Sequence, residues 1–130
     1  MAVATCIVAP TRIVTRVCDE ATAIPMGTVM KLSGTNTVIA SSADNDPFGG
    51  ITIEEFTGGE GITHVACAYD DGVFAIDTTA AAITVGQMVN LTAANQVAAA
   101  ADADFERGSI VGKAEETRTG TNRIRVRLGW

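Results

Sequence analysis

An internal repeat constrains the fold of this chain more than any other feature of its sequence. Residues 24–40 read IPMGTVMKLSGTNTVIA, and residues 83–99 read ITVGQMVNLTAANQVAA. A match at a fixed spacing indicates that one structural unit occurs twice. With gaps, a weaker match extends the two copies to residues 24–56 and 83–116. The shared residues are Ala23, Ile24, Gly27, Leu32, Asn36, Val38 and Ala40 in the first copy and Ala82, Ile83, Gly86, Leu91, Asn95, Val97 and Ala99 in the second.

Each copy has the pattern of a β-hairpin. Gly27 or Gly86 comes before a strand, and a turn that contains Asn36 or Asn95 leads into the returning strand. Gly and Asn accept the positive φ that tight turns require. A lone hairpin cannot bury its apolar side. We therefore expect the two hairpin units to pack together as a small pseudo-symmetric barrel or sandwich.

The composition favours an all-β fold in one domain. The chain has 130 residues, of which 47% are hydrophobic and only 5% are aromatic. Val, Ile and Thr suit strands, and no window has the apolar period of a long helix. We expect residues 1–20 to form an N-terminal arm and first strand, and residues 21–130 to form a single β domain. Outside the hairpins, strands are expected at residues 13–17, 51–56, 62–69, 72–77, 109–114 and 123–128.

The first residues have the composition of an apolar arm. Residues 2–9 are small and apolar, and Pro10, which lacks a backbone N–H, marks a break. Chain ends fray unless something holds them, and an apolar segment is not expected to stay free in water. We therefore expect the arm to dock on its own body, on a neighbouring copy or on a partner.

The distribution of charge excludes some partners. The formal net charge is −6, and apart from Lys31 every charged side chain between Val17 and Glu106 is acidic. Nucleic acids and anionic membranes both attract basic surfaces, so neither partner is expected. The beginning of the chain lacks the basic segment of a signal peptide, and no apolar run approaches the roughly 18 residues of a membrane span.

The sequence lacks the side-chain groupings expected of an enzyme or a metal site. His64 is the only histidine, and Cys6, Cys18 and Cys67 lack metal-ligand spacing. We interpret the cysteines as reduced, buried apolar side chains in a cytoplasmic setting. Catalytic carboxylates need a cleft, whereas the acidic pairs fall in predicted turns or on strand faces, so we expect no catalytic residue, metal or cofactor. The acidic pairs are Asp44/Asp46, Glu54/Glu55 and Asp70/Asp71.

The sharpest candidate site is an arginine stripe on the last predicted strand. Arg123, Arg125 and Arg127 alternate with apolar residues, so they share the outward face of the strand at residues 123–128. Such a stripe can form an interaction face. It can equally be a solvated face that protects a sheet edge from unwanted pairing.

Several phrases of the sequence resemble the bacteriophage head decoration proteins, also called capsid cement proteins. The phrases are AIPMGTVMKLSG, YDDGVFAID, AAITVGQMVNLTAANQV, GSIVGKAEE and RIRVRL, and the resemblance covers roughly residues 20–128. It implies a compact, β-tulip-like domain that carries out no chemistry. It also implies binding to the outside of an assembled head, commonly as a homotrimer, where the protein clamps major capsid protein subunits. The location would be the virion exterior, after assembly in the host cytoplasm.

The arm is the candidate capsid-binding segment under this resemblance. In such proteins the N-terminal segment often orders on the shell and sometimes adds a strand to a capsid sheet. We therefore expect removal of residues 2–17 to abolish binding and leave the fold intact. The alternative is a small β-barrel module that binds carbohydrate or another ligand, of the head-fibre or receptor-binding type. The candidate capsid-binding residues are Val3, Ile7, Arg12, Val14 and Arg16.

Overall fold

Two small β-barrels make up almost the whole structure. The structure is a computed structural model that describes residues 3–61, 63–79, 81–119 and 122–129. Strands dominate these residues, and one short helix interrupts them. The elements are β1 (Thr5–Val8), β2 (Val14–Val17), β3 (Val29–Gly34), β4 (Thr37–Ala40), β5 (Phe48–Thr52), β6 (His64–Ala68), β7 (Val73–Thr78), β8 (Met88–Ala93), β9 (Gln96–Ala99), α1 (Asp102–Arg107), β10 (Ile110–Ala114) and β11 (Arg123–Leu128).

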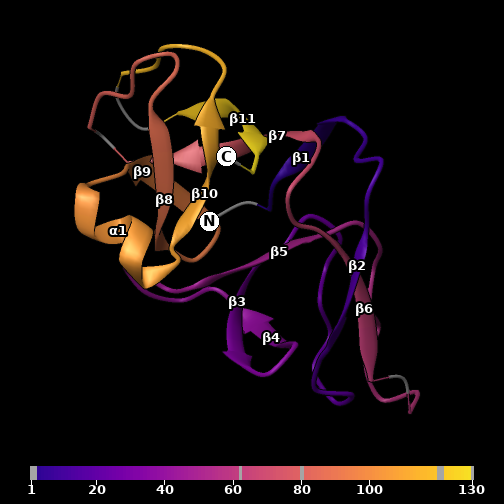
Figure 1. The fold of residues 1–130 in the computed structure, drawn as a ribbon. Helices are drawn as coiled ribbons and strands as arrows, with labels where there is room; N and C mark the ends of the chain where they lie inside the picture. The colour runs from indigo at the N-terminus through magenta and orange to yellow at the C-terminus, as the bar shows by residue number, and fades with distance from the viewer. Residues whose placement is uncertain (1–2, 62, 80, 120–121, 130) are drawn as a thin grey trace.

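Each barrel closes from five strands. In the first, which we call barrel 1, the strand order is β2-β4-β3-β5-β6. In barrel 2 the order is β7-β9-β8-β10-β11, because β7 pairs with both β9 and β11. β1 is added outside barrel 2, against β7. Figure 1 shows barrel 2, mostly orange and yellow, above barrel 1, mostly purple. The prediction of an all-β barrel fold is confirmed, with two barrels where one was expected.

The repeated unit is an entire barrel. β3 and β4 each begin 59 positions before β8 and β9, which is the spacing of the sequence match. β2 pairs in parallel with β4 at Val17 and Thr37, and β7 pairs in parallel with β9 at Thr78 and Val97. The two barrels therefore close at the same seam. The sequence match at residues 24–56 and 83–116 covers only the three central strands of each barrel.

The hairpin turns take the backbone conformations that were expected. Asn36 and Asn95, in the two turns, have φ of 51° and 55°. Gly27 and Gly86, which come before the hairpins, both have φ of 89°. L-residues with a side chain rarely adopt such a φ, whereas glycine does so freely. The sequence match between the copies therefore reflects a shared backbone path, and the predicted hairpins are confirmed.

One predicted strand begins and ends earlier in the chain than expected. The alternation around Ile51 predicts a half-buried strand at residues 51–56, but β5 covers Phe48–Thr52 and all its residues are buried. A Cβ at Gly49 would lie 2.8 Å from Cγ1 of Val38. β5 fits between its neighbours only because glycine leaves that space. A strand buried on both faces has no polar–apolar alternation, so the pattern did not mark it.

Packing joins the two barrels in one body. The larger buried cluster combines the interior of barrel 2 with residues of barrel 1 that include Val29 and Phe48. Hydrogen bonds also cross the junction. The Val29 amide donates to Oδ1 of Asn95 at 2.8 Å, and the Asn45 amide donates to the carbonyl of Leu91 at 3.0 Å. The second hairpin is therefore fixed against barrel 1, as the two hairpin units were expected to be.

The helix α1 follows β9, where barrel 1 has a loop instead. The Ala101 amide donates to the carboxylate of Asp104 at 2.7 Å, and the helix ends at Gly108, whose φ is 71°. In the barrel 1 loop the carboxylate of Asp46 similarly accepts from the Ser42 amide at 2.8 Å. Figure 1 places α1 on the side of the molecule away from β1 and β2. The difference between the copies therefore lies far from the arm.

Candidate functional site

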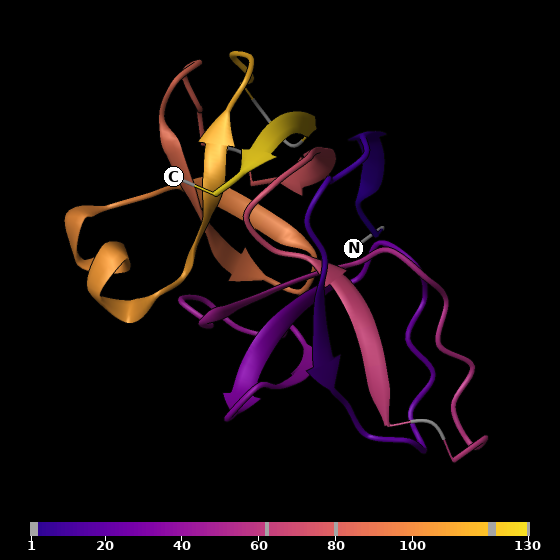
Figure 2. The same ribbon diagram turned by 45° about the vertical axis from the view of Figure 1, so that its right-hand side comes forward.

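The N-terminal segment runs along the connection between the barrels. β2 pairs antiparallel with β6, with Val14 facing Cys67, and β1 pairs antiparallel with β7, with Val8 facing Val73. Five residues separate Val8 from Val14, and five separate Cys67 from Val73, so the register continues across the bend. Figure 2 shows this indigo segment crossing from one barrel to the other. In this chain the arm therefore docks on its own body, and residues 5–17 clasp both barrels.

A buried alanine anchors the arm, by which we now mean residues 3–8. Ala4 is buried, and its amide donates to the carbonyl of Gly27 at 2.8 Å. A Cβ at Gly27 would lie 2.2 Å from the Ala4 carbonyl oxygen. Only glycine therefore lets the arm approach barrel 1 this closely. At the matching glycine of barrel 2, Gly86, no atom of the described residues lies within 4 Å of such a Cβ.

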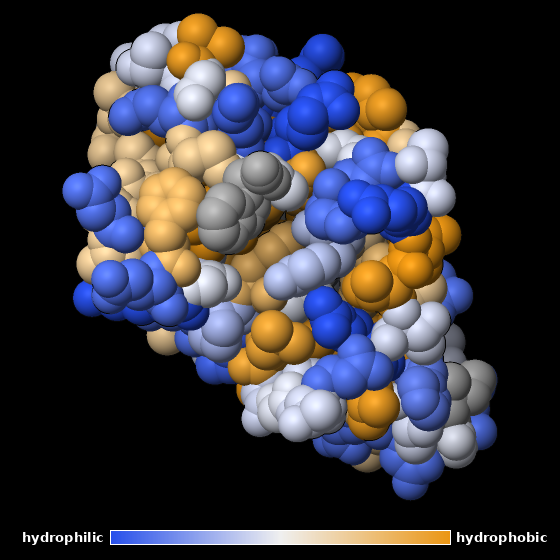
Figure 3. Space-filling view, in the orientation of Figure 1, coloured by the Kyte–Doolittle hydropathy of each residue, from blue (hydrophilic) through white to orange (hydrophobic). Residues whose placement is uncertain are grey.

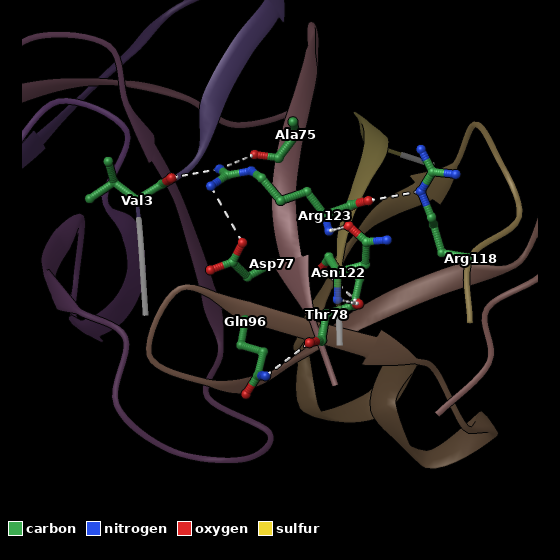
Figure 4. Close-up of polar contacts among 8 residues, drawn as sticks. All are labelled: Val3, Ala75, Asp77, Thr78, Gln96, Arg118, Asn122 and Arg123. Carbon is green, nitrogen blue, oxygen red and sulfur yellow. Dashed lines mark hydrogen bonds and ion pairs between the residues drawn. The ribbon is translucent and has the colours of Figure 1, made fainter. Parts of the chain in front are cut away.

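Arg123 holds the arm from the side of barrel 2. Its Nη2 donates to the carbonyls of Val3 at 2.6 Å and Ala75 at 2.8 Å, and its Nη1 lies 3.4 Å from Oδ1 of Asp77. Figure 4 shows the guanidinium between these three groups. Its Nε is buried without a partner in the described chain. This arginine of the predicted stripe thus points along the sheet to the arm, and most of its guanidinium binds groups of the same chain.

The stripe does not form one uniform face. The interior residues of β11, Ile124, Val126 and Leu128, are buried as predicted. Arg127 pairs with Glu115 at 2.8 Å, and Arg125 is exposed. Each of the three arginines therefore has a different setting: one binds the arm, one faces solvent and one pairs with an acid of the same chain.

We expect Arg123→Ala to loosen the arm without opening either barrel. The substitution removes one charged hydrogen bond to the arm, at Val3, and one to Ala75 of β7. A hydrogen bond of this kind makes a net contribution of about 1.5–3 kcal/mol. Amide exchange in residues 4–8 should rise by roughly tenfold or more, because local opening becomes easier. Arg125→Ala is the matched control and should leave that exchange unchanged. Equal exchange in the two variants would show that Arg123 does not hold the arm.

The linker between β1 and β2 is tied to the turn between β6 and β7. The Thr11 amide donates to Oδ2 of Asp71 at 2.7 Å, and the Thr11 hydroxyl donates to the same oxygen. Arg12 lies 2.8 Å from Asp70. The hydrogen bonds from Thr11, together with one from the Gly72 amide, lower the pKa of Asp71 from 3.8 to about 2. Arg12 is thus part of a surface ion pair within the chain.

The depressed pKa of Asp71 predicts an acid-sensitive linker. A carboxylate whose pKa is lower in the folded state stabilises that state above its unfolded pKa. The contribution is therefore complete above about pH 4 and is lost as the pH falls towards about 2. Thermal unfolding at pH 4 and pH 2 checks this. The wild type should lose more stability over that interval than Asp71→Asn, and an equal loss in the two proteins would contradict it.

The structure separates the predicted capsid-binding residues into two groups. Arg16 belongs to barrel 1, where its Nε donates to the carbonyl of Gly49 at 3.2 Å and its guanidinium lies 4.8 Å above the Tyr69 ring. Val14 is half-buried against the smaller buried cluster. Both side chains are half-buried and contact barrel 1. The others lie towards the surface: Val3, Ile7 and Arg12.

An apolar groove lies beside the arm. Its volume is about 590 Å³, and none of its lining residues is charged. Val3 and Ala4 of the arm line one side, and Ile13 at the end of the linker and Met26 before β3 also line it. Ile13 is 52% exposed and Met26 is 61% exposed. Figure 3 shows apolar, orange atoms interrupting the polar surface on the right-hand side, where β1 and β2 lie. We call this hollow the arm groove.

Sequence reasoning missed Met26 as a site residue. The repeat aligns Met26 with Val85, and both side chains are exposed, at 61% and 56%. The signal available in the sequence was an apolar residue directly before the repeated glycine, which is Met26 in the first copy and Val85 in the second. The arm makes the difference between the copies, because it covers Gly27 and supplies a wall beside Met26, whereas Gly86 lies open.

The remaining reactive side chains do not converge on a site. Burial raises the pKa of Cys67 to about 12, and burial followed by the charge of Asp19 raises the pKa of Cys18. Both thiols therefore stay protonated near neutral pH, whereas Cys6 is exposed rather than buried as expected. No cluster of three potential metal ligands occurs in the described ranges. Among the same residues, no helix has the length and apolar character to span a membrane.

Comparison with protein-family models and with curated proteins identifies no relative. No protein-family model matches the chain. No curated protein is similar enough to count as a match. Inference about function therefore rests on the arm, the arm groove and the charge of the surrounding surface.

Proposed function

We propose that this chain is a phage capsid decoration protein, which binds the outside of an assembled head and stabilises contacts between major capsid protein subunits. The observation that carries the proposal is the arm groove beside β1, an uncharged apolar hollow on a protein of net charge −6. Exposed apolar surface of this kind marks an interaction site. The resemblance of the sequence to capsid cement proteins supplies the kind of partner.

β1 offers a second means of attachment beside the groove. It pairs with β7 on one edge, and no strand of the described chain pairs with its other edge. An open edge accepts an extended partner segment by backbone hydrogen bonding, and side-chain pockets give such pairing its specificity. β1 has no charged residue to discourage pairing, and its Ile7 is 42% exposed. A strand of the capsid protein is therefore the proposed partner for this edge.

The strength of such a contact is modest for each copy. Burying a fully exposed Ile or Met side chain is worth about 1.5–3 kcal/mol. Ile7, Ile13 and Met26 are roughly half exposed, so each would contribute on the order of 1 kcal/mol. A homotrimer that engages three such sites at once multiplies this affinity without new contacts. The acidic surface keeps free copies apart in solution, so copies are expected to gather only when they bind the shell.

Co-sedimentation with expanded phage heads tests the proposal. The wild type should sediment with the heads and saturate at a stoichiometry set by the lattice. Met26→Glu should weaken binding by about a hundredfold, because a carboxylate buried in an apolar contact costs about 3 kcal/mol. Val85→Glu is the matched control, since Val85 occupies the same place in barrel 2 and is similarly exposed. Its binding should equal that of the wild type.

Two results would overturn the proposal. The first is equal binding by Met26→Glu and Val85→Glu, which would remove the arm groove from the interface. The second is failure of the wild type to sediment with heads while it binds an immobilised glycan panel. That result would favour the alternative, a small β-barrel module for carbohydrate.

A further inference from the structure

We propose that the arm is exchanged between copies, so that β1 of one molecule pairs with β7 of a neighbouring molecule. The inference deepens the proposed function, because it states how adjacent copies on a shell become linked. The occupant of the β7 edge is a second copy of this chain. The geometry of the exchanged contact is the one that the chain already makes with itself.

The arm is a separable element that binds mainly through its backbone. All four side chains of β1 are exposed. Its attachment consists of the ladder with β7, the buried Ala4 and the hydrogen bond from Arg123 to the carbonyl of Val3. Apart from Ala4, little apolar surface holds it. Elements with few buried contacts open locally at low free energy, so β1 can leave without global unfolding.

The site that receives the arm is complete without it. Barrel 2 closes through the pairing of β7 with β9 and β11, and β1 occupies only the part of the β7 edge that β9 leaves free. Departure of the arm therefore leaves both barrels closed. It exposes the edge at Val73–Ala75 together with the Arg123 guanidinium and the space above Gly27. This vacated edge is built to accept one particular extended segment, whichever molecule supplies it.

The linker permits the exchange. Residues 9–13 lie mostly at the surface, where Thr11 and the Arg12 backbone bind Asp71 and the Arg12 side chain pairs with Asp70. Exposed ion pairs are worth about 1 kcal/mol or less. Five extended residues span about 17 Å. Pro10 also favours an extended conformation at Ala9. The linker can therefore redirect the arm towards an adjacent molecule.

Local concentration decides which arm fills the site. The exchanged and unexchanged forms make the same contacts, which is the usual situation in domain swapping. A short tether gives the molecule's own arm an effective concentration in the millimolar range. In dilute solution the molecule's own arm therefore occupies the β7 edge. Copies held side by side on a shell reach comparable local concentrations, so a neighbour's arm competes and links the copies.

Disulfide trapping between two variants tests the exchange, each with one added cysteine and with the buried Cys18 and Cys67 left in place. Thr5 faces Ala75 across the β1–β7 ladder, and antiparallel partners lie at a distance that a disulfide spans. In a Cys6→Ser background, Thr5→Cys and Ala75→Cys proteins are mixed at about 1 mM, near the effective concentration of the tethered arm, and oxidised. The covalent heterodimer should form at least about tenfold faster than one between Thr5→Cys and Lys113→Cys, the collisional control at the exposed Lys113 of β10.

Equal rates for the two mixtures would overturn the proposal. The double variant, with Thr5→Cys and Ala75→Cys in one chain, should cross-link within the molecule. Its failure to do so would show that β1 does not pair with β7, and the proposed exchange would then be wrong as well. Trapping uses the protein alone, whereas the proposed function is tested by sedimentation with heads. A negative result in one experiment therefore leaves the other proposal standing.

Discussion

Removal of residues 2–8 is expected to abolish binding to phage heads while both barrels remain closed. The truncation deletes the open edge of β1 and one wall of the arm groove, so both proposed means of attachment are lost together. Loss of several contacts of about 1 kcal/mol each, repeated in every member of the proposed trimer, should reduce apparent affinity by at least about a thousandfold. Co-sedimentation measures binding, and far-UV circular dichroism checks the fold.

The position of the cut matters for this experiment. Removal of residues 2–17 was expected from the sequence to leave the fold intact, and that expectation is wrong, because Val14–Val17 form β2 and complete barrel 1. A cut after residue 8 spares β2. Val85→Glu in the full-length chain is the control and should bind like the wild type, because Val85 lies in barrel 2 outside the arm groove. Full decoration of heads by the truncated protein would contradict the assignment of the docking surface to the arm.

Gly112→Ala is expected to cause the largest loss of stability among single substitutions considered for this chain. A Cβ at Gly112 would lie 2.0 Å from the carbonyl oxygen of Arg127 and 2.8 Å from its carbon. These are backbone atoms of β11, so the clash is relieved only if β10 and β11 separate. Overpacking that displaces the backbone costs about 3 kcal/mol or more. Urea denaturation should show a loss of that size.

Gly34→Ala provides the matched control for that measurement. Gly34 also lies in a strand, β3, but an added Cβ would make ordinary contact, at 3.6 Å, with Cβ of Thr37. Its free energy of unfolding should stay within about 0.5 kcal/mol of the wild type. If Gly112→Ala unfolds at the same urea concentration as Gly34→Ala, then β10 and β11 do not approach each other as closely as described.

The sequence predicted the hairpins well because their turns demand particular residues. Gly27 and Asn36, with their counterparts in the second copy, take positive φ, and few other residues tolerate it. β6 and β11 are also counterparts, yet His64–Ala68 and Arg123–Leu128 share little sequence. A strand in such a barrel needs only apolar residues at the inward positions, such as Val65 and Ile124. The sequence match therefore did not reveal that β6 and β11 correspond, although all five strands of the barrel are repeated.

The candidate site was only partly predictable for a different reason. Residues 2–9 could be identified as an arm that docks, because an apolar segment is more stable when it is buried against another surface. The place of docking depends on the close approach of Ala4 to Gly27 and on the reach of Arg123 to Val3, which are distant in sequence. Alternation along β11 predicts which arginines point outward, but it cannot predict what each meets. The arm groove exists only once these long-range contacts form.

Hydrogen exchange of the protein bound to expanded heads, compared with the free protein, tests the central claim most directly. The claim is that the arm and the arm groove form the surface that meets the shell. The account predicts slower exchange on binding in residues 4–13 and 24–28, and no change in residues 83–87, the matching segment of barrel 2. Protection of residues 83–87 with none in residues 4–13 would contradict it.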